Sequence, residues 1–480
     1  MNDLPDRYAP SQLLKRYFGF DQFRTSQSAV IDHVLAGKHA MVVMPTGMGK
    51  SLCYQIPALS FPASSGQLVL VLSPLIALMQ DQVDSMQQRG IEATFINSSL
   101  DRETRMRRYE DVADGRYRLL FVTPERFRKP DFCDVISKRT VSLLAVDEAH
   151  CVSQWGHDFR PDYTRVGEIR QLLGNPTTIA LTATATAECR RDIYRQLQIP
   201  ENDIRLFHEG IDRPNLTLDV QPVWDESEKI AALGDLLQDP DYSSGSVIVY
   251  FSLIKTLQRF SEHLTSDGLD HVCYHGDLGR GLRRRLQDEF MNGDADVVLA
   301  TNAFGMGIDK EDIRMVIHAE TPGSIESYYQ EIGRAGRDGK PSRCVWLYDQ
   351  SDLMTQMQFI EWSNPDAAFY TRLYQLLVEH NEQCRAFGLD WMNEQIQRRS
   401  RHDHRMTTAI SILDRHGVIG GPRPPECFEV LESLPVMLQD DERLSEKKRR
   451  DQQRLYAMVQ LAAEEGDRKE FLNRYFLEEG

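Results

Sequence analysis

The sequence predicts two α/β domains, each built on a doubly wound parallel sheet, followed by a mostly helical C-terminal region with a winged-helix-like unit. Three observations predict this fold class. Short runs of Val, Ile and Leu alternate with helix-length segments over residues 38–350, as expected for parallel strands buried on both faces. The alternation breaks at Gly210–Pro214. After about residue 350 the apolar runs stop.

Eight apolar runs are the expected strands. They are His39–Met44, Leu68–Leu72, Leu119–Val122, Ser142–Val146, Thr178–Leu181, Ser246–Phe251, Val297–Ala300 and Val316–His318. The break after the fifth run divides them into a first domain over residues 1–212 and a second domain over residues 213–350. A chain of 480 residues is long enough for two such domains and a further unit.

The C-terminal region is expected to be helical. Apolar residues recur at helical spacing over Asp366–Glu379 and over His404–Arg415, and the second segment ends at a glycine and runs into Val418-Ile419. A helix, a glycine stop and a short strand fit a winged-helix-like unit within residues 351–432. We expect residues 433–480 to form one or two further helices.

The composition excludes several classes of protein. Apolar residues at 41% and charged residues at 27% exclude a wholly disordered chain. No membrane span is expected, because no apolar run approaches ~18 residues. The first residues do not resemble a signal peptide, which favours a cytoplasmic protein. The eight cysteines are dispersed without a Cys-x-x-Cys pair and are expected to be reduced.

The formal net charge of −16, taken alone, argues against a nucleic-acid partner. Half of this excess lies in residues 201–245, which hold eleven acidic and three basic side chains. Basic clusters lie elsewhere, at Arg280 with Arg283–Arg285, at Arg398–Arg405 and at Lys447–Arg450. Each cluster could equally be a solvated helix face. A polyanion is therefore not excluded, but any basic track must be local.

A candidate phosphate loop lies between an expected strand and a helical segment. Its glycines allow backbone N–H groups to approach a polyphosphate closely. Lys50 can bring a charge to the phosphates, and the Ser51 hydroxyl can ligate Mg²⁺. The candidate phosphate-binding residues are Thr46, Gly47, Met48, Gly49, Lys50 and Ser51. Met44 replaces the usual first glycine, so the loop alone could also be a glycine-rich turn before a helix.

Two further motifs carry complementary chemistry. Asp147 and Glu148 end an apolar strand, where Asp147 can hold Mg²⁺ through water and Glu148 can orient or deprotonate the attacking water. Arg334 and Arg337 are spaced by one helical turn, and both could stabilise charge that develops on a γ-phosphate. Because the two halves supply complementary parts, we expect a nucleotide to bind between the domains, with hydrolysis coupled to their closure.

An ordered series of motifs over roughly residues 10–350 resembles the superfamily 2 helicases, and the RecQ DNA helicases in particular. The series is Phe18–Gln27, Met44–Ser51, Ser73–Gln82, Thr123–Arg126, Asp147–His150, Ala180–Thr186, Tyr274–Gly276, Ala300–Lys310 and Gln330–Gly339. One such motif would be weak evidence, whereas the whole series in order is specific.

The resemblance implies two RecA-like domains that bind ATP and Mg²⁺ and move 3′→5′ along single-stranded DNA. It implies that Phe20, Arg24 and Gln27 contact adenine, with Phe20 where a tyrosine is usual. It also assigns nucleotide contacts to Gly305 and Asp309, and a catalytic role to Gln330 beside Lys50, Asp147, Glu148, Arg334 and Arg337.

The stretch Ser153–Tyr163 is similar to the aromatic-rich loop that in this family senses single-stranded DNA. Its aromatic rings are stacking platforms tolerant of base identity, although a loop of core aromatics is the alternative. Hydroxyls in other motifs would contact the DNA backbone and carry no sequence information. The candidate DNA-binding residues are Ser73, Thr123, Trp155, His157, Phe159, Arg160 and Thr301.

One part of the chain departs from the family pattern. Residues Arg454–Phe476 resemble the paired helices of the family's zinc-binding platform, but Asp467 stands where the first cysteine ligand is expected. Cys384 and Cys427 are too isolated to complete a four-ligand site. We therefore predict no zinc. In the family the winged helix follows these helices and often carries the hairpin that separates the strands. Here the winged-helix-like unit precedes them, which leaves the efficiency of unwinding open.

The resemblance thus implies an ATP-dependent DNA helicase that acts on single-stranded DNA and 3′-tailed duplexes, in DNA repair, recombination or replication. Such a protein would be nucleoid-associated in a bacterium. An RNA helicase, or a translocase that does not unwind, stays open as an alternative. A non-enzymatic scaffold is disfavoured, because the residues needed for hydrolysis are intact.

Overall fold

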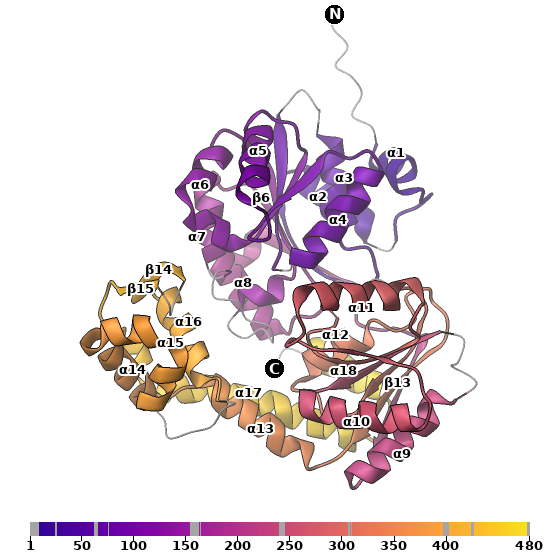
Figure 1. Ribbon diagram of the computed structural model, residues 1–480. Helices are drawn as coiled ribbons and strands as arrows, with labels where there is room; N and C mark the ends of the chain where they lie inside the picture. The colour runs from indigo at the N-terminus through magenta and orange to yellow at the C-terminus, as the bar shows by residue number, and fades with distance from the viewer. Residues whose placement is uncertain are drawn as a thin grey trace, which may run out of the picture.

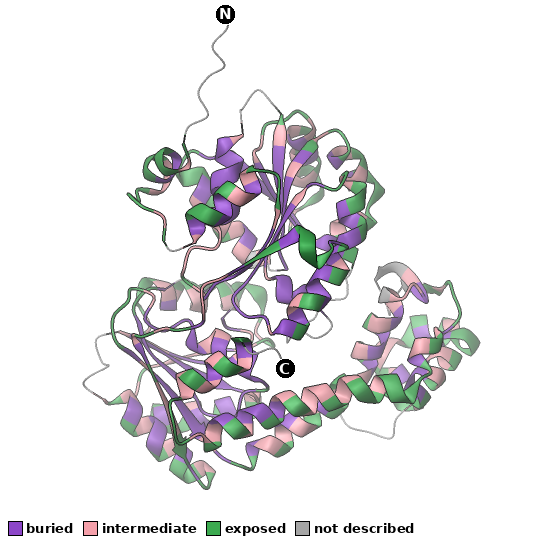
Figure 2. Cartoon of the chain, turned by 180° about the vertical axis from the view of Figure 1, so that it is seen from behind, coloured by how far each residue is buried: buried purple, intermediate pink, exposed green. Residues whose placement is uncertain are grey.

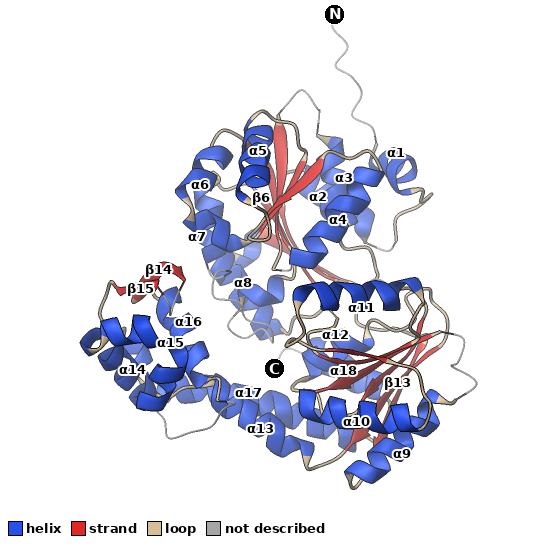
Figure 3. Ribbon diagram, in the orientation of Figure 1, coloured by secondary structure: helices blue, strands red, loops and turns tan. Residues whose placement is uncertain are grey.

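The computed structural model describes residues 9–24, 26–61, 66–74, 76–153, 163, 165–239, 245–305, 308, 310–396, 403–423 and 427–477. One α/β domain lies above a second, and a smaller helical unit extends to one side (Figure 1). Strands form the centre of each domain and helices surround them (Figure 3). The predicted fold class is confirmed, with two parallel sheets followed by a helical region.

The first domain holds a seven-stranded sheet of order β3-β4-β2-β5-β6-β1-β7, in which neighbouring strands are parallel. Its strands are β1 (His39–Val43), β2 (Gln67–Leu72), β3 (Ala93–Ile96), β4 (Leu119–Val122), β5 (Thr140–Val146), β6 (Thr177–Thr182) and β7 (Ile204–His208). Its helices are α1 (Pro10–Leu13), η1 (Leu14–Phe18), α2 (Gln27–Leu35), α3 (Leu52–Ser60), α4 (Ile76–Gln88), α5 (Arg102–Ala113), η3 (Pro124–Arg128), α6 (Pro130–Ile136), η4 (Ala149–Val152), α7 (Val166–Leu172), α8 (Ala187–Leu197) and η6 (Glu201–Asp203). Apolar side chains form a core on each face of the sheet.

The second domain holds a six-stranded parallel sheet of order β10-β11-β9-β12-β13-β8. Its strands are β8 (Leu216–Pro222), β9 (Ser246–Phe251), β10 (Val272–Tyr274), β11 (Val297–Thr301), β12 (Ile313–His318) and β13 (Ser342–Tyr348). Its helices are α9 (Glu226–Leu237), α10 (Ile254–Ser266), α11 (Arg280–Asn292) and α12 (Ile325–Ile332). Parallel strands place all their carboxyl ends at one edge, where motif residues gather.

All eight expected strands are present, with limits that differ from the expected ones by at most three residues. In the described residues of the two parallel sheets, five further strands lie outside the expected runs: β3, β7, β8, β10 and β13. Four of these five are the outermost strands of the two sheets. Outer strands tolerate polar residues such as Arg205 and Asp219, which interrupt a continuous apolar run.

The C-terminal region forms a helical unit and two helices that return to the second domain. Its elements are α13 (Asp352–Ser363), α14 (Ala367–Glu379), α15 (Asn381–Ile396), α16 (Arg405–Arg415), β14 (Ile419–Arg423), β15 (Cys427–Val430), η7 (Val436–Leu438), α17 (Asp441–Ala463) and α18 (Arg468–Leu477). Helices α14 to α16 and the antiparallel pair β14–β15 share one core. After α16, Gly417 takes a φ of +71° and the chain enters the strand pair.

Helices α17 and α18 complete the core of the second domain. Met458 and Leu461 of α17 and Phe476 of α18 are buried in the same cluster as Trp346 of β13. The Phe476 ring packs edge-on against Tyr329 of α12, at a centroid distance of 5.4 Å. This packing joins α17 and α18 to the second sheet. The expected limits of the four units stay predictions.

Burial follows this organisation. Most residues of the inner strands of both sheets are buried, whereas the long helix pair that leads to the helical unit alternates buried, intermediate and exposed residues (Figure 2). This pair is α13 and α17, which Lys448 of α17 joins by an ion pair of 2.6 Å to Glu361 of α13. Among the residues that the structure describes, no helix is both long enough and apolar enough to cross a membrane.

Candidate nucleotide-binding site

The phosphate loop connects β1 to α3 and has the backbone conformation that its glycines permit. Gly47 has a φ of +83° and Gly49 a φ of +74°, in the left-handed region that favours glycine. A Cβ atom on Gly49 would lie 2.6 Å from Nε2 of Gln27. The loop therefore needs glycine both for its conformation and for the close approach of its neighbours.

Lys50 lies at the end of the loop, and its Nζ donates a hydrogen bond of 2.9 Å to the carbonyl oxygen of Met44. Burial lowers the pKa of Lys50, and the carboxylates of Glu148 and Asp147 oppose this effect. The ammonium thus has a backbone partner across the loop and two carboxylates nearby. This is the position from which a lysine can meet the phosphates of a bound nucleotide.

Asp147 and Glu148 follow β5 at the carboxyl edge of the sheet. The Asp147 carboxylate accepts a hydrogen bond of 3.0 Å from the backbone N–H of Glu148. Burial, and secondarily the charge of Glu148, raises the pKa of Asp147 to about 7. Glu148 has a φ of +47° and its Oε2 lies 3.3 Å from Nδ1 of His150. Two adjacent carboxylates with little water form a site that favours a cation.

Residues at the start of α2 and just before it also contact the phosphate loop. Gln27 donates from Nε2 to the carbonyl oxygens of Met48, at 2.8 Å, and Gly49, at 3.1 Å. Arg24 donates from Nη1 to the carbonyl oxygen of Gly47 at 3.0 Å, and its backbone N–H donates to Gln27 Oε1. Phe20 is half-exposed and lines the same cavity. Two of the three candidate base-binding residues, Arg24 and Gln27, thus also contact the loop that would hold the phosphates.

The two arginines of the second domain reach this site differently. Arg337 lies against the phosphate loop, because a Cβ atom on Gly47 would be only 3.3 Å from Cγ of Arg337. Arg334 is buried and donates from Nη1 to the carbonyl oxygen of Gly305. Both side chains line the cavity, but Arg334 is also anchored inside its own domain.

A cavity of about 600 Å³ brings these groups together between the domains. This volume lies within the range of about 300–1,000 Å³ for small-molecule sites. Its lining includes the candidate residues Phe20, Arg24, Gln27, Thr46, Gly47, Gly49, Lys50, Ser51, Asp147, Glu148, Gln330, Arg334 and Arg337. Met48 and Gly305 contribute carbonyl acceptors to residues of this set, whereas Asp309 lies outside the described residues.

The candidate DNA-binding residues Ser73, Thr123 and Thr301 do not line this cavity. Ser73 and Thr123 follow β2 and β4, and the Ser73 N–H donates a hydrogen bond of 3.1 Å to the carbonyl oxygen of Val122. Thr301 ends β11 in the second domain and is buried. The other candidates, Trp155, His157, Phe159 and Arg160, lie outside the described residues.

Comparison with known proteins identifies the family. Residues 24–192 match the family model described as DEAD/DEAH box helicase, and residues 228–339 match the helicase conserved C-terminal domain. The chain is 42% identical over 378 residues to the ATP-dependent DNA helicase RecQ of Bacillus subtilis, covering 78% of this chain and 62% of that protein. It is 39% identical to the probable ATP-dependent DNA helicase RecS of the same species, covering 77% of this chain and 73% of RecS. The chain belongs to the RecQ family.

A solved structure supports the fold of this RecQ-family chain. The helicase Lhr of Mycobacterium smegmatis, bound to single-stranded DNA and AMP-PNP, superposes with a TM-score of 0.58 at 20% sequence identity. The superposition covers 84% of this chain and 57% of Lhr. At this identity the likeness shows the fold alone. The sequence alignment with the B. subtilis RecQ spans less than two thirds of that relative.

Several residues that line the cavity between the domains are not predicted as site residues from the sequence. Helix α4 contributes Leu78, Asp81, Gln82 and Ser85, and α11 contributes Gln287, Asp288 and Met291. These two helices face one another across the domain boundary (Figure 1). Asp81 and Gln82 belong to the motif Ser73–Gln82, so a signal for them was present in the sequence. The α11 residues carry no motif, and only the docking of the two domains brings them to the cavity.

Proposed function

We propose that this RecQ-family protein is an ATP-dependent DNA helicase that translocates 3′→5′ on single-stranded DNA and unwinds duplex DNA. The observation that carries the proposal is the cavity that joins the phosphate loop of one domain to Arg334 and Arg337 of the other. A nucleotide there would contact both domains, so its hydrolysis would change the contact between them. The names of the relatives, which are DNA helicases, favour DNA over RNA.

The proposed roles combine positions in the structure with the motifs of the sequence. Lys50 and the loop N–H groups bind the phosphates, and Glu148 orients or deprotonates the attacking water. Arg337, which lies against the loop, stabilises the charge that develops on the γ-phosphate, and Gln330 and Arg334 line the same side. Phe20, Arg24 and Gln27 contact the base, with Gly305 and Asp309 as further nucleotide-site residues. Ser73, Thr123 and Thr301 contact the DNA backbone, and Trp155, His157, Phe159 and Arg160 contact the bases and phosphates of a single strand.

The carboxylate pair fits a magnesium ion. A buried carboxylate whose pKa rises to about 7 beside a second carboxylate is stabilised in its charged form by a nearby cation. Asp147 and the Ser51 hydroxyl are the residues that would hold Mg²⁺ with the nucleotide. The ion would neutralise phosphate charge as it develops.

We also propose the four-unit division at residues 212, 350 and 432, a cytoplasmic location and a chain without zinc. In the part of the chain that the structure describes, no three His, Cys, Asp or Glu side chains lie close enough together to hold a metal ion. The absence of zinc stays a prediction, which metal analysis of the purified protein would test.

Two measurements test the proposed function. ATP hydrolysis should rise with single-stranded DNA more than with duplex DNA or RNA of equal length, and Lys50→Ala should abolish it. Trp155→Ala should remove the stimulation by DNA while nucleotide binding is kept. In the second assay, a 3′-tailed duplex should be unwound and a 5′-tailed duplex should not. A hydrolysis rate that is independent of DNA would contradict the proposal.

A further inference from the structure

The turn that carries the two arginines is held from behind by a residue of the segment that joins the domains. Arg213 donates to three carbonyl oxygens of this turn: Gly333 at 3.3 Å, Ala335 at 2.8 Å and Gly336 at 2.9 Å. A guanidinium has five N–H donors in a fixed planar arrangement, so one side chain fixes the backbone on both sides of Arg334.

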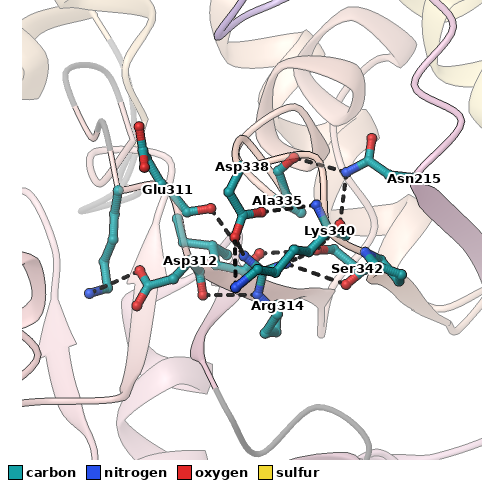
Figure 4. Close-up of polar contacts among 12 residues, drawn as sticks. Asn215, Glu311, Asp312, Arg314, Ala335, Asp338, Lys340 and Ser342 are labelled. Carbon is teal, nitrogen blue, oxygen red and sulfur yellow. Dashed lines mark hydrogen bonds and ion pairs between the residues drawn. The ribbon is translucent and has the colours of Figure 1, made fainter.

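Asn215 fixes the other half of the turn. Its Nδ2 donates to the carbonyl oxygens of Gly336, at 2.8 Å, and Lys340, at 2.9 Å, and so spans the residues around Arg337. Gly336 has a φ of +56°, and a Cβ atom on it would lie 2.4 Å from Asn215 Nδ2. The turn and the asparagine are therefore in direct contact, as Figure 4 shows for Asn215 and Lys340.

A second arginine holds the same turn from the sheet. Arg314 is buried in β12 and donates to Asp338 Oδ2 at 2.6 Å and to Ser342 Oγ at 3.1 Å. Figure 4 shows Asp338 and Lys340 between Arg314 and Asn215. The backbone of the turn thus has partners on both sides, and Arg213 and Asn215 are the two that come from the inter-domain segment.

The same segment is bonded to the base-binding part of the first domain. Glu209 accepts a hydrogen bond of 2.8 Å from the backbone N–H of Ser26, next to Gln27, and its own N–H donates to Val43 of β1. Ile211 accepts a hydrogen bond of 2.7 Å from the hydroxyl of Tyr329 in α12. Residues 209–215 therefore link the segment before α2 to the arginine turn of the other domain.

We propose that Arg213 and Asn215 are positioning residues for ATP hydrolysis, which hold the arginine turn so that Arg337 stays against the phosphate loop. The inference rests on the proposed function. Neither residue lines the nucleotide cavity, so neither is expected to contribute to nucleotide affinity. A misplacement of about 1 Å can cost about 100-fold in rate, so loss of the three Arg213 hydrogen bonds should reduce kcat strongly.

The first test compares Arg213→Gln with Arg343→Gln in the full chain. Arg343 is a matched control, because it is a partly buried arginine of the same domain whose ion pairs are with Asp219 and Asp239. DNA-stimulated kcat should fall about 100-fold in the Arg213 variant and stay unchanged in the control. The Kd of a fluorescent ATP analogue should be unchanged in both. Asn215→Ala should reproduce the kcat loss, and it replaces Arg213→Gln if thermal unfolding shows that the latter does not fold.

The second test separates positioning from a general structural role. If Arg213 acts through Arg337, Arg213→Gln should change kcat by less than about twofold in a chain that already carries Arg337→Ala. Losses that multiply in the double variant, an unchanged kcat in the single variants, or a weakened Kd with normal kcat would each overturn the inference. If the unsubstituted chain hydrolyses no ATP, the proposed function itself fails. If it hydrolyses ATP but the variants give one of the contrary results above, only the positioning role of Arg213 fails.

Discussion

At the scale of single residues, the Asp147 carboxyl group connects burial to magnesium binding. Its pKa is raised to about 7, first by burial and then by Glu148. In the ligand-free protein the native state therefore binds more protons than the unfolded state between about pH 4 and pH 7, and this group lowers stability as the pH rises through that window. A cation that binds the carboxylate must displace the proton.

We predict that Mg²⁺ binding with a nucleotide releases a proton at pH 6 and that this release is lost at pH 8, because Asp147 is protonated below about pH 7 and ionised above it. The affinity for Mg²⁺ should rise with pH over the same range. Calorimetric titrations in buffers of different ionisation enthalpy measure the proton release. Asp147→Asn is the control and should release fewer protons at pH 6, because only the nucleotide phosphate then titrates. Equal release at both pH values would contradict the prediction.

Gly49 offers a second test at this scale, because its φ of +74° disfavours any side chain and a Cβ atom would displace the Gln27 amide from the loop. We predict that Gly49→Ala weakens nucleotide binding at least tenfold, since a left-handed non-glycine residue costs about 1–2 kcal/mol before the clash is added. Gly268→Ala is the matched control, with the same φ and no atom within 4 Å of its Cβ. The control should lower the unfolding temperature without changing the Kd of the nucleotide. Similar affinities in the two variants would show that the Gln27 contact is unimportant.

The sequence alone identifies functional residues that belong to a short local motif. Lys50, Asp147 and Arg337 each stand in such a motif, and the cavity brings the three together. Arg213 and Asn215 could not be found in this way, because their partners are backbone carbonyls about 120 residues away in sequence. A carbonyl acceptor leaves no mark in the composition, so only the folded chain shows these contacts.

At the scale of secondary structure, the periodicity predicts helices better than outer strands. Helix α14 begins after Asp366, which accepts the N–H of Phe369 as an N-cap, and the apolar spacing alone marks its extent. Strand β7 has exposed residues at Arg205 and Leu206, so no continuous apolar run marks it. Strand β13 lies inside its sheet and has buried residues from Cys344 to Leu347, a signal that the sequence did contain.

The sequence indicates the role of helix α17 least well, because the two ends of this helix pack against different parts of the molecule. Its last turns pack in the core of the second domain, whereas its first turns lie beside α13 and the helical unit. We predict that Met458→Ala lowers the free energy of unfolding by about 2–5 kcal/mol, as for other large-to-small core substitutions. Tyr456→Ala, two residues away on the exposed side, should change it by less than about 0.5 kcal/mol. Chemical denaturation of both variants measures the difference. An equal cost would mean that α17 does not support the second domain.

At the scale of the whole molecule, ion pairs join units that are far apart in sequence. Arg128 of the first domain lies 2.9 Å from Asp414 of α16, and Arg450 of α17 lies 2.8 Å from Glu188 of α8. Partly exposed pairs of this kind contribute about 0–1 kcal/mol each. They therefore allow the helical unit and the first domain to change their contact at low cost.

These pairs also change the interpretation of the basic clusters in a chain of net charge −16. Within Lys447–Arg450, Lys447 pairs with Asp451 at 2.9 Å and Lys448 with Glu361 at 2.6 Å. The first pair lies within α17, and the second joins α17 to α13. Fewer positive charges are then available for DNA, and a single strand should be held by few phosphate contacts.

We predict that the affinity for single-stranded DNA depends only moderately on salt, with a slope of log K against log salt no steeper than about −3, which corresponds to about four phosphates at about −0.7 each. Lys448→Gln should leave the slope unchanged, because its partner is Glu361 and not a phosphate. Fluorescence anisotropy at several salt concentrations measures both slopes. A slope near zero would contradict local phosphate contacts. If the slope of log K against log salt became about 0.7 less steep in Lys448→Gln, Lys448 would contact a phosphate, and α17 would lie on the path of the DNA.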